Sequence, residues 1–423
     1  RWDMIAGGFR NPYGLDFNPD GELFVYDADM EWDEGSPWYR PTRVNHVVSG
    51  GDYGWRQGTD KWQAYFPDSL PGNADLGLGS PTAIAFGTDS NFPEPYRHAL
   101  FILDWAYGKI IAVHLMPEGA SYRGQAEEFV TGRPLNVTGV DFGPDGAMYF
   151  VTGGRRTQSG LYRVRYVGGE SLPSLGQAAA GEAKRARELR RRLEQFQSRR
   201  SIEGVGLAWE HLGNDDPWIR HAARVALENQ ALEQWKLPAL TESNTKKALS
   251  ALMALARSSD PKVQSQIFGR LNDLPWEGLP MQWQLVALRT YQLAFTRMGG
   301  GRPGDRNPII KKIVTASEKS AEVRMEVSRL LIYLKAPGII TGLLNYVVDA
   351  VSPEERLFYL FHMRHIADGW TPPHRRAYFA WLKKMTEVLG EPHYQTYLKH
   401  IAAAALAKGP PGERERFAAL FVP

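Results

Sequence analysis

Two stretches of this chain repeat one pattern that decides its fold: Asn11–Asp27 reads NPYGLDFNPDGELFVYD, and Asn136–Gly153 reads NVTGVDFGPDGAMYFVTG. Each holds a short apolar run, a Pro-Asp-Gly turn and a second apolar run. Proline presets φ and glycine supplies a positive φ in such turns, so each stretch predicts two strands joined by a turn. A third segment, Ser80–Leu115, has the same two apolar runs around an inserted loop.

The spacing of these units predicts a β-propeller. Leu15, Ile84 and Val140 take equivalent positions, 69 and 56 residues apart, which suits blades of about 40–50 residues with loops. Propellers close with four or more blades, and only three are recognised. We therefore expect a partial propeller of about three blades over residues 1–170, with open edges, an apolar flank and earlier blades missing from this chain. A small β-sandwich is the alternative.

The chemistry of the chain changes after residue 170. Residues 1–170 hold 14 Lys/Arg and 22 Asp/Glu, a net charge of −8, whereas residues 171–423 carry a net charge of +11. Residues 171–202 predict a charged helical linker whose basic run forms a solvated helix face. Alternatively, the basic run could bind nucleic acid or an acidic membrane. Nucleic-acid binding is disfavoured, because no aromatic residues lie among the arginines to stack on bases.

Residues 203–423 predict an all-α, HEAT-like solenoid of helical repeats. Asp216-Pro217 and Asp260-Pro261 each place an N-cap before a proline, 44 residues apart, and this spacing matches the HEAT period. Ser352-Pro353 and Thr371-Pro372 open further helices. Such arrays present extended surfaces, so we expect a protein partner here, and the positive charge favours an acidic one.

Composition excludes several kinds of chemistry. The 423 residues include no cysteine, which rules out disulfides, thiol nucleophiles, cysteine-bound metals and a covalently attached c-type haem in this chain. No run approaches the roughly 18 apolar residues of a membrane helix. The sequence has no nucleophile elbow, phosphate-binding glycine loop, dinucleotide fingerprint or zinc-binding helix motif. Its start, without Met or a signal-like run, indicates a fragment or a mature segment.

Carboxylates gather after the first predicted pair of strands. Asp27, Asp29, Glu31 and Asp33 alternate along the chain, and oxygen ligands in such an arrangement suit calcium. An acidic surface loop is the other interpretation.

Arg10 and Asn11 precede the first predicted strand. An arginine at that place in a propeller can hold an anionic ligand by a forked contact, and a structural hydrogen bond within the blade is the alternative. The aromatic turn Asp52–Arg56 is expected to be a packing plug between blades rather than a pocket wall.

Several of these segments together resemble a known family. Phe9–Leu15, Pro19–Gly21, Asp27–Asp33 and Gly50–Trp55 resemble, in order and approximate spacing, the soluble glucose/sorbosone dehydrogenases. Those enzymes are six-bladed propellers that use pyrroloquinoline quinone (PQQ) with calcium. The order of blades followed by HEAT-like helices is similar to the large membrane-bound dehydrogenase-type proteins of planctomycetes and verrucomicrobia, in which a c-type cytochrome domain follows.

The resemblance implies a periplasmic or exported oxidoreductase that acts on a small sugar or alcohol and passes electrons to a c-type cytochrome in its parent protein. Arg10 and Asn11 match cofactor-contacting residues of the family, and Tyr13 stands where the family has a glutamine. Carboxylates at 27–33 replace the backbone carbonyls that hold calcium in the family.

Other family features are missing. Asn136 and Thr138 stand where the family has two arginines that clamp the cofactor. The catalytic histidine of the family lies in an earlier blade, so the isolated chain is expected to be inactive as a dehydrogenase. A non-catalytic propeller-plus-solenoid scaffold that binds glycan or protein is the alternative function.

Overall fold

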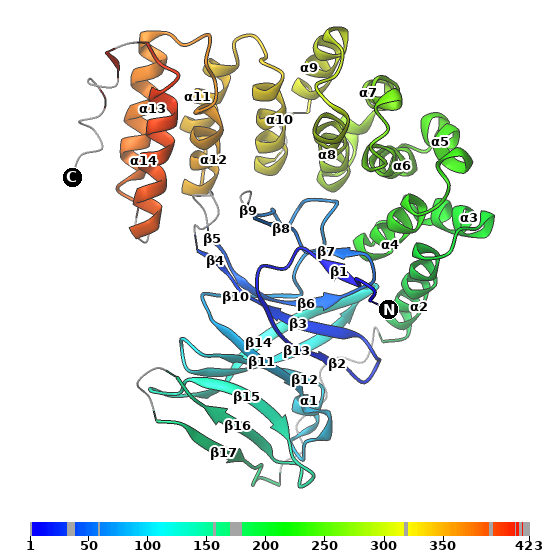
Figure 1. The fold of residues 1–423 in the computed structure, drawn as a ribbon, viewed down its shortest axis with the longest axis vertical. Coiled ribbons are helices and arrows are strands. Elements are labelled where there is room, and N and C mark those ends of the chain that lie inside the picture. Colours follow the sequence, from blue (N-terminus) through cyan, green and yellow to red (C-terminus); the bar gives the residue numbers. More distant parts are fainter. Residues whose placement is uncertain are drawn as a thin grey trace. The chain divides into compact units, whose positions relative to one another are not determined.

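The computed structural model describes residues 2–31, 39–57, 60–154, 158–169, 180–316, 320–388, 392–410, 412–413 and 417 (Figure 1). The chain divides into two compact units: Arg1–Met30 with Tyr39–Ala231, and Glu31–Trp38 with Leu232–Pro423. The division after Ala231 differs from the predicted boundaries at 170 and 202, because three helices pack in the same unit as the sheets.

The first unit contains three antiparallel sheets that follow one another along the chain. Their strand orders are β10-β6-β3-β2, β11-β12-β13-β14 and β15-β16-β17. The strands are β2 (Pro12–Phe17), β3 (Leu23–Asp27), β6 (Thr42–Val47), β10 (Ala74–Gly77), β11 (Pro81–Phe86), β12 (Ala99–Asp104), β13 (Lys109–Glu118), β14 (Ser121–Thr131), β15 (Val137–Phe142), β16 (Met148–Thr152) and β17 (Gly160–Val164). Shorter strands are β1 (Ala6–Gly7), β4 (Met30–Glu31), β5 (Tyr39–Arg40), β7 (Gly51–Asp52), β8 (Trp55–Arg56) and β9 (Asp60–Lys61).

Each repeated sequence segment forms the first two strands of one sheet. The turns between β2 and β3 and between β15 and β16 hold Gly21 and Gly146 at φ values of 73° and 72°, the left-handed region that glycine enters without steric penalty. The Pro-Asp-Gly pattern therefore predicted both hairpins correctly.

The sheets adjoin through their first strands, β2, β11 and β15. The Asp16 carboxylate on β2 accepts the backbone N–H of Phe86 on β11 at 2.7 Å, and the Thr82 hydroxyl on β11 donates to the carbonyl of Val137 on β15 at 2.8 Å. The first strands of the three sheets lie side by side, and the later strands of each sheet lead away from them. This arrangement fits a partial, propeller-like β domain.

The middle sheet is most deeply buried at β12, whereas its edge strand β14 is mostly exposed. Every residue of β12 is buried. Leu100 and Ile102 pack with Phe24 and Tyr26 of the first sheet, whereas Phe101 and Leu103 belong to a cluster that includes strands of the third sheet. Successive side chains on a strand point to opposite faces, so a strand between two other sheets is apolar on both faces, as residues 99–103 are before the strand ends at Asp104.

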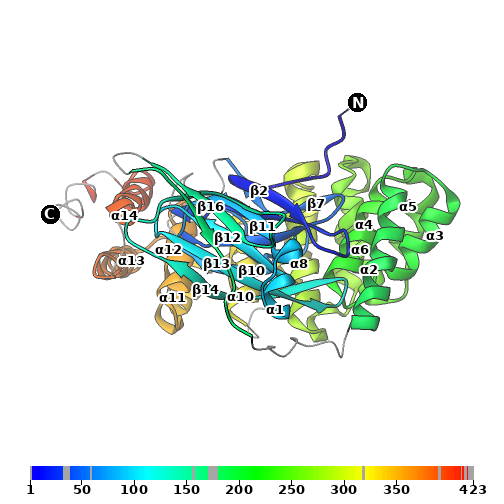
Figure 2. The same ribbon diagram turned by 90° about the horizontal axis from the view of Figure 1, so that it is seen from below.

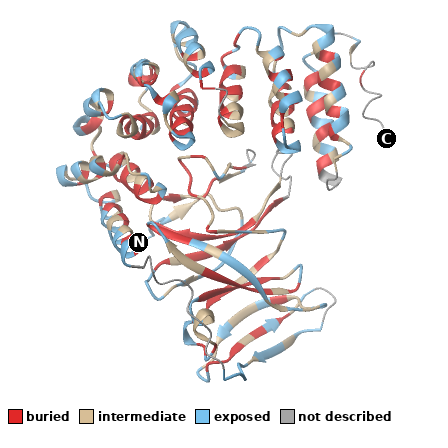
Figure 3. Ribbon diagram, turned by 180° about the vertical axis from the view of Figure 1, so that it is seen from behind, coloured by how far each residue is buried: buried red, intermediate tan, exposed pale blue. Residues whose placement is uncertain are grey.

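Strand β2 of the first sheet and strand β17 of the third are largely exposed, whereas β3 and β6 of the first sheet are buried (Figure 3). On β2, Leu15 and Phe17 are 64% and 56% exposed, and on β17 Leu161 is 71% exposed. Part of the expected apolar flank is therefore present, as exposed apolar side chains on β2 and β17.

Three helices complete the first unit: α2 (Ala180–Glu194), α3 (Ile202–His211) and α4 (Pro217–Glu228). They pack against one another (Figure 2). A short helix, α1 (Glu94–Arg97), precedes β12. Asp216 caps α4, because its carboxylate accepts the N–H of Trp218 at 2.8 Å, as the Asp-Pro pattern predicted.

The prediction that the basic run of residues 176–200 is only a solvated helix face is wrong for α2. Arg187 and Arg190 are 3% and 1% exposed. Arg190 donates to both oxygens of Glu22 at 2.7 and 2.6 Å, and Arg187 donates to Asp20 at 2.8 Å. The first hairpin thus supplies the carboxylates that allow these arginines to be buried.

The second unit is helical. Its α-helices are α5 (Leu232–Thr241), α6 (Thr245–Arg257), α7 (Gln264–Asp273), α8 (Met281–Met298), α9 (Arg306–Val314), α10 (Ala321–Tyr333), α11 (Ile339–Asp349), α12 (Pro353–Met363), α13 (Pro372–Met385) and α14 (Pro392–Leu406). Helices α6, α8, α10, α12 and α14 contact one another in succession, and α5, α7 and α9 do the same. Assignment to the HEAT class stays a prediction. None of the described helices combines the length and hydrophobicity needed to cross a bilayer.

Candidate functional site

The predicted cofactor residues lie at the start of β2. The backbone N–H groups of Arg10 and Asn11 donate to Oδ1 of Asp27 at 3.0 and 2.9 Å, which fixes the chain as it enters the strand. Asn11 is exposed and Arg10 is half-buried. Tyr13, two residues further, is 46% exposed. The structure therefore brings these three predicted residues to one accessible strand end.

Asp27 is fully buried at the end of β3, and its second oxygen faces a lysine. Oδ2 lies 3.2 Å from Nζ of Lys61. The same ammonium donates to the carbonyl of Ala28 at 2.8 Å, and the carbonyl of Pro41 lies 3.4 Å away. Burial lowers the pKa of Lys61 and the Arg43 charge lowers it further, while Asp27 opposes both, so that it stands at about 8. No local pattern pointed to Lys61, because its contacts come from segments 20 and 33 residues away.

Asp104 in the second sheet makes the same kind of backbone contact as Asp27. Asp104 ends β12 as Asp27 ends β3. Its Oδ1 accepts the N–H of Ser80, just before β11, at 2.9 Å and that of Ala106 at 3.0 Å. In both sheets a carboxylate at the end of the second strand holds the backbone that leads into the first. The same structural hydrogen bond therefore occurs in both sheets. It explains why an aspartate stands at position 27 without requiring a bound ligand.

The described carboxylates do not fit a calcium site. No three or more His, Asp or Glu side chains among the described residues converge closely enough to share an ion. The Asp27 carboxylate accepts hydrogen bonds from two backbone amides and pairs with Lys61. Asp29 is buried, with 5% of its surface exposed. The side chain of Glu31 and the whole of Asp33 lie outside the described residues, so calcium at those two positions stays a prediction.

The aromatic turn at Asp52–Arg56 is packed rather than open. Tyr53 is 1% exposed, and its ring stacks on Phe9 with centroids 4.6 Å apart. Its hydroxyl donates to the carbonyl of His46. The turn thus braces the segment that carries Arg10, which favours the packing interpretation.

Asn136 and Thr138 also make hydrogen bonds within the β domain. The Asn136 amide donates to the carbonyl of Trp105 at 3.0 Å, and the Thr138 hydroxyl donates to the carbonyl of Val151 at 3.3 Å. Neither residue supplies a positive charge, so the only predicted cofactor residue with a cationic side chain is Arg10.

Fold and site together define an incomplete propeller-like domain with an accessible, arginine-bearing strand end. No protein-family model and no curated protein matches this chain. Among solved structures, it is similar to an oxidoreductase described as a glucose dehydrogenase from Thermus thermophilus, with 24% identity and a TM-score of 0.31 over 38% of this chain and 46% of that one.

A second glucose dehydrogenase matches with 23% identity and a TM-score of 0.32, over 39% of this chain and 48% of that one. The PQQ-bound aldose sugar dehydrogenase from Streptomyces coelicolor matches with 15% identity and a TM-score of 0.28, over 38% and 44% of the two chains. This chain thus spans less than half the length of these proteins.

Proposed function

We propose that this chain is part of a propeller oxidoreductase of the quinone-dependent sugar or alcohol dehydrogenase type. The observation that supports the proposal is the placement of Arg10, Asn11 and Tyr13 at one accessible end of β2, with their backbone anchored by Asp27. The sequence around them resembles the cofactor-contacting segment of that family.

These residues suit the anionic part of such a cofactor. The guanidinium of Arg10 presents a planar fork of donors that matches a carboxylate, and the Asn11 amide adds both a donor and an acceptor. PQQ, when bound, would supply the two-electron oxidation of a hydroxyl group. Arg10 and Asn11 would bind and orient it, while Tyr13 would lie beside the same strand end.

This chain offers no identified general base for hydroxyl oxidation. We therefore propose that the isolated chain is inactive, and that electrons in the parent protein pass to a c-type cytochrome in the periplasm or outside the cell. Calcium would depend on Glu31 and Asp33, because Asp27 is already paired with Lys61.

Titration with PQQ tests the proposal. Isothermal calorimetry on the parent protein, with and without calcium, should show saturable PQQ binding that Arg10→Gln weakens about tenfold, the loss expected for a charge-assisted contact. Arg97→Gln changes an exposed arginine on α1 and should leave the affinity unchanged. Absence of PQQ uptake by the complete propeller would refute the proposal.

A non-catalytic scaffold that binds glycan or protein is the second candidate. It is favoured by the structural use of Asp27 and Asp104, which leaves neither carboxylate for chemistry. In that case a glycan array should give a signal that survives Arg10→Gln, and the helical unit should bind an acidic protein partner in a salt-sensitive manner.

A further inference from the structure

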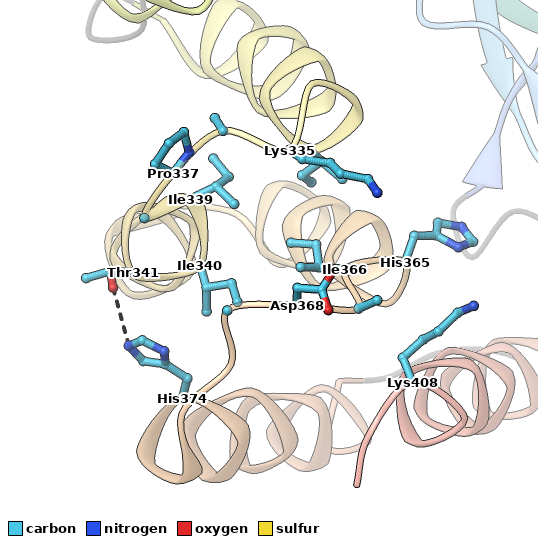
Figure 4. A pocket seen from close by; sticks show the side chains of 15 residues that line it. Lys335, Pro337, Ile339, Ile340, Thr341, His365, Ile366, Asp368, His374 and Lys408 are labelled. Atoms are coloured by element: carbon cyan, nitrogen blue, oxygen red, sulfur yellow. Dashed lines mark hydrogen bonds between the residues drawn. The ribbon is translucent and has the colours of Figure 1, made fainter. Parts of the chain in front are cut away.

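The second unit contains a cavity of about 550 Å³ between its C-terminal helices (Figure 4). It lies among the turn from α10 to α11, the loop from α12 to α13, and the end of α14. This volume falls within the range of small-molecule sites, about 300–1,000 Å³. The helical repeats predict a surface for a partner protein in this region, and no local sequence pattern indicates a pocket.

Part of the lining of the cavity is aliphatic. Ile332, Ile339, Ile340 and Ile366 supply aliphatic side chains from α10, α11 and the loop after α12. A short hydrocarbon chain would bury its surface here, and each methylene group removed from water adds to binding.

Basic groups gather on one side of the cavity. Figure 4 shows Lys335, His365 and Lys408 arriving from three different elements with their nitrogen atoms on the same side. Lys335 and Lys408 form no ion pair with a carboxylate among the described residues. Burial lowers the pKa of His365, and the charges of Arg364 and Lys408 lower it further, so the two lysines are the permanent charges.

The start of α11 borders the side of the cavity opposite to the lysine nitrogen atoms (Figure 4). Gly338 is the N-cap of α11, at a φ of 70°, and provides no side chain to cap the helix. The first amide of α11, that of Ile339, donates to the carbonyl of Ala336 at 3.4 Å, so the lysines supply the positive charge. Asp368 is the one carboxylate in the lining, so the two lysines leave a surplus of one positive charge.

We infer that this cavity binds a small organic monoanion: a carboxylate or similar acid group held between Lys335 and Lys408, with an aliphatic body over the four isoleucines. The same chemistry is available from a free short-chain carboxylic acid and from the C-terminal carboxylate of a peptide ending in an aliphatic residue. The inference is independent of the function proposed for the sheets.

Octanoate and 1-octanol are matched probes, since they share an aliphatic chain and differ in charge. Calorimetry on the full chain should show octanoate binding, with 1-octanol at least tenfold weaker. Hydrogen exchange should slow in peptides covering residues 335–341 and 365–374. A peptide ending in leucine with a free carboxylate, compared with its amide, tells whether the anion comes from a peptide.

Lys335→Gln and Lys408→Gln should each weaken octanoate about fivefold, and together about twentyfold, as expected for partly exposed ion pairs. Lys399→Gln changes an exposed lysine on the same helix as the cavity wall, α14, and should have no effect. Equal affinity of the double variant and the wild type, equal binding of 1-octanol, or no binding of either carboxylate probe would overturn the inference.

Discussion

Replacing Glu22 with glutamine should destabilise the first unit by about 3 kcal/mol at pH 7. Glu22 is 5% exposed. Its carboxylate accepts from Arg190 at 2.6 Å and lies 3.1 Å from Arg191, and it accepts from Nε2 of His46 at 2.8 Å. Glu22→Gln keeps the shape but removes one of the two carboxylate partners of the buried Arg190, leaving only Glu194 at 2.7 Å. Breaking a buried ion pair costs about 3–5 kcal/mol when no partner remains, so the lower end of that range is expected here.

The lowered pKa of Glu22 gives a similar value for the loss of folding free energy. Burial alone would raise this pKa, but the hydrogen bond with His46 and the charge of Arg190 lower it from its usual 4.5 to about 2. That depression corresponds to about 3 kcal/mol. The stabilisation is present above pH 4.5 and is lost as pH falls through 2, so the difference between Glu22→Gln and wild type should shrink over that range.

Hydrogen exchange at increasing urea concentrations is the suitable assay, since the chain has two compact units and a single unfolding curve would mix them. Peptides from β6 and α2 report the first unit. Glu203→Gln, which removes an exposed pair with Arg199, is the control and should change stability by less than about 1 kcal/mol. A loss for Glu22→Gln no larger than the control, or one that persists undiminished near pH 2, would show that the buried pair does not hold α2 to the sheet.

Two further substitutions test the close approach of the first two sheets and the aspartate contact within the second sheet. Gly14→Ala should destabilise the first unit by more than about 2 kcal/mol, because Gly14 has a φ of 69° and a Cβ there would lie 2.9 Å from the Ile84 nitrogen. Gly21→Ala, with a φ of 73° and open space around it, isolates the backbone effect. An equal loss for the two variants in urea-dependent hydrogen exchange of the first unit would refute the close approach. Asp104→Ala removes the acceptor of the Ser80 amide and should cost about 1–3 kcal/mol; unchanged exchange of that amide would contradict the clamp.

Local patterns predicted much of the secondary structure. The Pro-Asp-Gly turn needs only its own residues to set φ, so the hairpin around Gly21 was correct. The Asp216 cap was correct for the same reason, since the acceptor and its donors are two or three residues apart.

The candidate site could be predicted only in part. Arg10, Asn11 and Tyr13 lie together because they are neighbours in the sequence. The partner of Asp27 was missed, since alternating acidic residues suggested a shared cation and nothing local indicated that Lys61 would face the carboxylate. The cavity beside Lys335 and Lys408 was missed because those lysines are 73 positions apart.

By itself, the sequence determined where strands and helices begin, because turns and caps depend on φ preferences and on donors within a few residues. Only the tertiary structure decided which charges are buried. Arg190 and Glu22 are separated by 168 positions, and an arginine on a highly charged helix is solvated unless a folded surface brings a carboxylate to it. The sheets supply that carboxylate, which turns a basic run into a buried contact.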